Sequence, residues 1–271
     1  MIGWLYPFSF IYLFSNSGTS GESGALKMAS GSTTAGDTGE IEILTGVATG
    51  GKGGDISLVV GTGNSGVGGT VTISAGETSA VTQNGGDVIV TAGTGSAGTA
   101  AGGGSVQVTG GTGQSNTGGA ITVTSGTGAT TSSGSVTISS ANAGTTGVSG
   151  EMNIYTGTTT SGSSGRVRLS TGAATSGTGG EIDLSVGTGN SGKGGQVQIN
   201  AGDSSAASKS GGDIIVTAGS GTSVTKGEGG AITVDGGVGA ASTGGALSLT
   251  SGVGTATTSG AVTIASAVGG N

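Results

Sequence analysis

The side chains best suited to chemistry in this chain are carboxylates that stand two residues apart. Glu181 and Asp183 form one such pair, and Glu40 and Glu42 form another. Two neighbouring carboxyl groups can divide the acid and nucleophile roles of glycoside hydrolysis between them. Paired carboxylates also occur wherever acidic and basic residues alternate on a surface, so their neighbours decide the interpretation.

Those neighbours are basic. Arg166 and Arg168 occupy, one repeat unit earlier, the positions of Glu181 and Asp183, and Lys27 stands in the same relation to Glu42. If successive units lie side by side, each acid falls beside a base, and such pairs contribute about 0.2–1 kcal/mol each. We therefore expect ion pairs rather than catalysis, with no catalytic residue and no enzymatic activity.

Glycine-rich loops are the second feature that could bind a ligand. Residues 61–66, 93–98 and 187–192 fit the dinucleotide pattern G-x-G-x-x-G, and Lys193 extends the last towards a phosphate-binding loop. With 67 glycines in 271 residues, such matches arise by chance. Gly194 also stands where that loop needs Ser or Thr, and a predicted strand follows where the phosphate needs a helix N-terminus. We expect no nucleotide and no other cofactor.

Composition excludes several further classes. The chain has no Cys and no His, which removes thiol and imidazole chemistry, disulfides and the usual zinc ligands. Seven Lys and Arg against 14 Asp and Glu argue against nucleic acid, which needs a basic patch. The same 14 acids are too few for the Asp-dense shells of calcium-binding β-rolls, so no metal site is predicted.

A repeat underlies the whole chain from Gly24 onwards. It has the form Gly, any residue, aliphatic, any residue, aliphatic, which we call the repeat frame, and its basic step is 15 residues. The 16 frames begin at Gly24, Gly39, Gly54, Gly69, Gly86, Gly104, Gly119, Gly134, Gly150, Gly165, Gly180, Gly195, Gly212, Gly230, Gly245 and Gly260.

The order of residues within the frame argues against a disordered linker, which the Gly, Ser and Thr content alone would favour. All 32 aliphatic positions are filled, and 24 of them hold Val or Ile. Alternating β-branched residues indicate a short strand with one buried face. We therefore predict an all-β fold, a single-stack β-solenoid (parallel β-helix) of about 16 coils, because stacked repeats can bury a column that one unit cannot.

A longer repeat of 126 residues lies over the first. Residues 60–66 return as 186–192, and both copies lengthen the same two adjacent turns, 77–85 with 94–103 in one and 203–211 with 220–229 in the other. This tandem duplication predicts a solenoid block over 16–149 and a second, continuous block over 150–271. The lengthened turns are either contact points or tolerated insertions, and the second interpretation is favoured because surface turns accept extra residues at little cost.

The first 15 residues differ from the rest, since six of the seven aromatic residues lie within residues 1–14. The alternatives are a partial signal sequence, a hydrophobic cap, a membrane anchor or an incorrect start in the gene model. The stretch is too short to span a bilayer comfortably, so a signal remnant or a wrong start is favoured, with a cap as the main rival. We also expect the predicted solenoid to be part of a longer protein.

Hydroxyl pairs beside the second aliphatic position suggest an alternative function. Ladders of Thr-x-Thr on flat solenoid faces are typical of ice-binding proteins. The matching residues are Thr72, Ser74, Thr122, Thr124, Thr137, Ser139, Ser248 and Thr250. The same column is interrupted by Lys27, Glu42, Asn153, Arg168, Asp183 and Gln198. The interruptions make ice binding the second choice.

The units at 134–150 and 180–195 resemble the long Gly/Ser/Thr-rich repeat proteins predicted in diatoms and related algae, over residues 16–271. The resemblance implies a large extracellular or cell-wall protein and brings no activity with it. We expect a non-enzymatic structural protein, a spacer or matrix element, secreted or at the cell surface. Its partners would be polysaccharide, mineral or ice surfaces, or further coils of the same protein; a surface adhesin is a further alternative.

Overall fold

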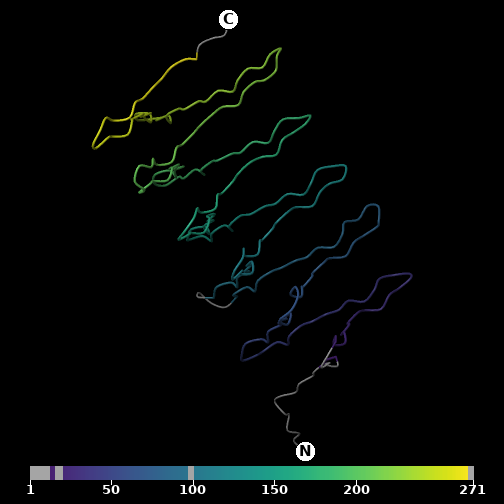
Figure 1. The fold of residues 1–271 in the computed structure, drawn as a ribbon. Helices are drawn as coiled ribbons and strands as arrows, with labels where there is room; N and C mark the ends of the chain where they lie inside the picture. The colour runs from purple at the N-terminus through teal and green to yellow at the C-terminus, as the bar shows by residue number, and fades with distance from the viewer. Residues whose placement is uncertain (1–12, 16–20, 97–100, 268–271) are drawn as a thin grey trace, which may run out of the picture. The chain divides into compact units, whose positions relative to one another are not determined.

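The computed structural model describes residues 13–15, 21–96 and 101–267. Within these ranges the backbone forms no helix and no β-strand; extended stretches alternate with narrow bends and turns (Figure 1). The predicted β-solenoid is therefore wrong for the part of the chain that the structure describes. The predictions for residues 1–15 fall almost wholly on residues 1–12, outside the described ranges.

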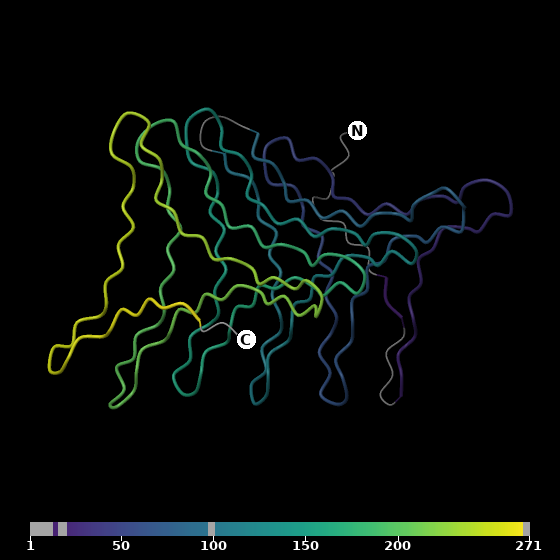
Figure 2. The same cartoon turned by 90° about the horizontal axis from the view of Figure 1, so that it is seen from above.

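The backbone hydrogen bonds agree with the absence of a sheet among the described residues. A β-ladder needs bonds between the repeat frames of successive units, but eight of the ten backbone bonds among the described residues close a turn onto the first glycine of a frame. Gly86 N–H donates to the Gly76 carbonyl at 2.9 Å, and Gly119 N–H to that of Gly111 at 2.8 Å. None of these bonds joins one repeat frame to another. Figure 2 shows the same backbone from a second direction.

The exposure of the aliphatic side chains also agrees with the absence of a sheet with a buried face. At the first frame position their exposed fraction runs from 48% at Met152 to 63% at Val167, and at the second from 61% at Val234 to 88% at Ile264. No described residue is buried. The expectation that all 32 point into a core is therefore wrong. With two aliphatic residues in a 15-residue unit otherwise rich in Gly, Ser and Thr, the burial available does not offset the entropy lost on ordering the backbone.

Local structure nevertheless repeats at the spacing of the sequence duplication. The described glycines with positive φ form three pairs, each separated by 126 residues. These are Gly21 (95°) with Gly147 (143°), Gly36 (97°) with Gly162 (110°), and Gly66 (80°) with Gly192 (84°). The same sequence position therefore reverses the chain in both copies, at a conformation that only glycine adopts without strain.

The turn-closing hydrogen bonds follow the same rule. The four bonds that close turns onto Gly86, Gly104, Gly119 and Gly134 return, 126 residues later, at Gly212, Gly230, Gly245 and Gly260. Their lengths run from 2.8 to 2.9 Å in the first set and from 2.8 to 3.0 Å in the second. Each copy of the duplication therefore forms the same turns from its own residues.

The contacts between residues divide the chain into two compact units, Met1–Ile138 and Ser139–Asn271. The block boundary predicted between residues 149 and 150 stays a prediction. In the part of the chain that the structure describes, no helix has the length and hydropathy needed to cross a membrane.

Candidate functional site

The lengthened turns at residues 77–85 and 203–211 are each held by local hydrogen bonds. Gln83 N–H donates to the Ala80 carbonyl at 3.4 Å, and Ala80 N–H donates to the Thr78 hydroxyl at 3.2 Å. Together these bonds form a hydroxyl-capped β-turn. The Thr78 hydroxyl, two residues before the first residue of the turn, helps to fix the conformation of the turn.

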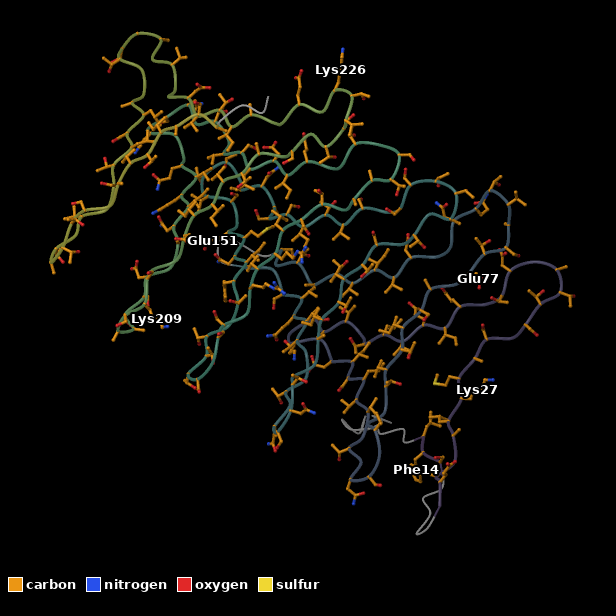
Figure 3. All side chains as sticks on the ribbon, turned by 45° about the horizontal axis from the view of Figure 1, so that its top comes forward. Phe14, Lys27, Glu77, Glu151, Lys209 and Lys226 are labelled. Carbon is orange, nitrogen blue, oxygen red and sulfur yellow. The ribbon has the colours of Figure 1, made fainter. Side chains whose placement is uncertain are left out.

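The second copy builds the same turn from different residues. Lys209 N–H donates to the Ala206 carbonyl at 3.3 Å, and Ala206 N–H donates to the Ser204 hydroxyl at 3.4 Å. Ser208, at the third turn position, has a φ of 60°. In Figure 3, Lys209 and Lys226 project from turns with their amino groups away from the backbone. The turns present isolated side chains and no enclosed site.

The predicted ion pairs do not form within the chain. Among the described residues the one salt bridge joins Lys52 Nζ to Asp55 Oδ1 at 2.9 Å, with Oδ2 at 3.0 Å. Both side chains are 78% exposed. The pair lies three residues apart, so local geometry is enough to make it. Pairs between successive units need a backbone register that the chain does not form.

The carboxylate pairs are therefore exposed and separate from the bases expected beside them. Glu181 and Asp183 lie on the surface, as do Arg166 and Arg168, with no nitrogen and oxygen of the two groups within salt-bridge distance. No pocket forms over the described residues. The arrangement offers no enclosed position where a substrate bond would lie between two carboxyl groups, as glycoside hydrolysis requires.

One calcium-binding pattern in the sequence was not predicted. Residues 50–55, Gly-Gly-Lys-Gly-Gly-Asp, fit the G-G-x-G-x-D start of the calcium-binding β-roll repeat, but Ser57 stands where the longer pattern has an aliphatic residue. In the structure Asp55 is paired with Lys52, a cation that competes with metal for the carboxylate. The described residues hold no group of three or more potential metal ligands.

The glycine-rich loops form bends without an associated helix. Residues 64–67 and 190–193 bend around Gly66 and Gly192, and extended backbone follows each loop. A phosphate-binding loop uses the amide groups at the start of a helix. Neither described loop supplies them.

The eight hydroxyl residues of the alternative ice-contact face are all exposed. No strand fixes their spacing in the described ranges, so the structure does not assemble Thr72, Ser74, Thr122, Thr124, Thr137, Ser139, Ser248 and Thr250 into a flat array. Their assignment to a surface-contact face stays a prediction.

Comparison with protein families, with curated proteins and with solved structures gives no match to this chain.

Proposed function

We propose that this chain is a non-enzymatic structural protein, a repetitive matrix or spacer element at the cell surface or outside the cell. The observation that carries the proposal is the recurrence of the same turns, positive-φ glycines and hydrogen bonds at a spacing of 126 residues. A duplication of this kind presents the same weak surface contact more than once along the chain. An active site needs the opposite, a few different side chains brought to one place.

The exposure of the hydroxyl groups supports the same role. The Ser and Thr side chains beside the aliphatic positions lie on the surface along both compact units. Hydroxyl groups donate and accept hydrogen bonds without carrying charge. Many such weak contacts suit adsorption to polysaccharide or mineral, where affinity accumulates over linked contacts.

Adsorption of the purified chain tests this proposal. The chain is mixed with cellulose, chitin, silica and calcium carbonate particles, and the protein left in solution is measured after centrifugation. We expect saturable adsorption to at least one surface that survives about 0.5 M salt, because salt screens charges and leaves hydroxyl hydrogen bonds in place. Replacement of Thr122, Thr124 and Thr137 by Val keeps the shape and weakens binding. Retention of none of the four surfaces would contradict the proposal.

Ice binding stays the alternative, and no observation in the structure favours it. Adsorption to ice needs a rigid and uninterrupted array of hydroxyl and methyl groups, and the described residues form no strand to hold one. We expect negligible thermal hysteresis and no shaping of ice crystals. Faceted ice growth at micromolar protein, lost on Thr122→Tyr, would favour the alternative.

A further inference from the structure

Two adjacent repeat frames in the second compact unit carry opposite charges. Residues 165–169 read Gly-Arg-Val-Arg-Leu and residues 180–184 read Gly-Glu-Ile-Asp-Leu. In the first copy of the duplication the corresponding frames, 39–43 and 54–58, read Gly-Glu-Ile-Glu-Ile and Gly-Asp-Ile-Ser-Leu and hold only acids. At these two frame positions the second copy therefore carries two bases opposite two acids, whereas in the first copy a single base, Lys27, stands on the frame next to Glu40 and Glu42.

Within one chain these charges have no partners. The salt bridge among the described residues, Lys52 with Asp55, involves none of them. The second copy also lacks the equivalent of the Lys52–Asp55 pair, because Thr178 stands at the position of Lys52 and Glu181 at the position of Asp55. Two arginines and two acids therefore remain available to a partner.

The backbone and the aliphatic residues of the same frames are equally available. None of the ten backbone hydrogen bonds among the described residues uses residues 165–169 or 180–184, although Thr171 Oγ1 donates to the Gly180 carbonyl at 3.1 Å. Val167 and Ile182, at the frame centres, are 63% and 50% exposed. An extended segment with free N–H and C=O groups and exposed β-branched residues is a template for pairing with another chain.

We propose that residues 165–169 of one molecule pair with residues 180–184 of a second copy of this chain. Val167 then faces Ile182 whether the two segments run parallel or antiparallel. Each arginine faces an acid in either direction: Arg166 meets Glu181 or Asp183, and Arg168 meets the other. The same contact made reciprocally gives a closed, two-fold symmetric dimer, in which each frame is used once.

Sedimentation velocity of the full chain tests the proposal, which does not depend on the matrix role. At low salt we expect a concentration-dependent dimer that weakens at about 0.5 M salt, since exposed ion pairs are screened. Arg166→Glu with Arg168→Glu places like charges opposite each other and weakens dimerisation at least about tenfold. Glu181→Arg with Asp183→Arg has the same effect.

The decisive experiment mixes the two double variants, Arg166→Glu with Arg168→Glu and Glu181→Arg with Asp183→Arg. One carries acids on both frames and the other carries arginines on both, so neither dimerises alone and the mixture forms a heterodimer. The quadruple variant, which exchanges the charges within one chain and keeps its net charge, regains the homodimer. Glu40→Arg with Glu42→Arg is the matched control, because it makes the same charge change on a frame outside the interface and leaves dimerisation within about twofold of the original.

Three results would overturn the proposal. The first is a chain that remains monomeric at low salt up to about 1 mM, since a contact weaker than that would not act at any ordinary concentration. The second is a mixture of the two double variants that stays monomeric. The third is a loss of dimer in the Glu40 and Glu42 control equal to that of Glu181→Arg with Asp183→Arg, which would show that the loss follows from the change in net charge and not from pairing at residues 180–184.

Discussion

The turns and the repeat frames of this chain behave differently, although the sequence repeats both with equal regularity. The backbone hydrogen bonds, the positive-φ glycines and the hydroxyl caps of the described residues lie in or beside turns. The frames have extended backbone, half-exposed aliphatic residues and no ladder of hydrogen bonds. Turns need only residues close in sequence, whereas a strand needs a partner segment brought from elsewhere.

The two kinds of ion pair teach the same lesson. Lys52 and Asp55 are three residues apart and lie 2.9 Å from each other, while Arg168 and Asp183, a full unit apart, do not pair. A local pair loses little chain entropy on forming, and a distant pair gains only when the intervening segment is already ordered. Among these ion pairs, the local pair therefore forms and the pair between successive units does not.

The largest effect in a turn is expected from Gly66→Ala. An alanine at a φ of 80° costs roughly 1–2 kcal/mol, so the population of the native bend at residues 64–67 falls about 5- to 30-fold. NMR coupling constants and chemical shifts of these residues measure the change. Gly68→Ala is the matched control, since Gly68 has no neighbour that an added Cβ would meet. An equal effect of the two substitutions would show that the backbone conformation does not define the bend.

A smaller effect is expected from Gly110→Ala. An added Cβ would overlap the Gly119 carbonyl oxygen, so the hydrogen bond from Gly119 N–H to the Gly111 carbonyl is lost. The loss of about 0.5–1.5 kcal/mol corresponds to a roughly 2- to 12-fold faster amide exchange at Gly119, measured by NMR.

Two references make this result interpretable. Gly111→Ala has open space for the new methyl group and leaves exchange at Gly119 nearly unchanged. The bond from Gly245 N–H to Gly237, the equivalent 126 residues later, serves as an internal standard in the same molecule. Unchanged protection of Gly119 in Gly110→Ala would contradict the turn geometry.

The smallest effect is expected in a frame, from Ile138→Asp. A buried charge would be severely destabilising, but Ile138 is 74% exposed, so we expect local changes within about 0.5 kcal/mol. Circular dichroism and amide exchange across residues 126–145 check this. A large loss of structure would mean that the frame is buried, and it would reverse the distinction between turns and frames.

Parts of the structure could be predicted from the sequence and parts could not. The duplication predicted equal turns in both copies, and Ala80–Gln83 and Ala206–Lys209 form them despite different side chains. The alternation of aliphatic residues predicted strands, and this prediction is wrong for the described residues, because periodicity reports which side chains are able to share a face and not whether anything covers that face. The prediction of Arg168 beside Asp183 failed with the same assumption, because it depended on one unit lying against the next.

The candidate site follows the same division. The exposure of the eight Ser and Thr residues of the alternative contact face agrees with their polar character, but their spacing as an array depends on a sheet that the described residues do not form. The pattern at residues 50–55 was readable from the sequence and was missed. Its pairing of Lys52 with Asp55 was visible only in three dimensions.

The sequence by itself determined the 126-residue period, the recurrence of the lengthened turns and the exclusion of thiol, imidazole and disulfide chemistry, because these depend on residue type and on interactions within a few residues. Only the tertiary structure decided that the aliphatic positions stay exposed and that the charges of neighbouring frames stay apart. Burial and long-range pairing depend on a balance between hydrophobic gain and conformational entropy, summed over the whole chain. With two aliphatic residues in each glycine-rich unit, that balance leaves the frames exposed and unpaired, while the turns form.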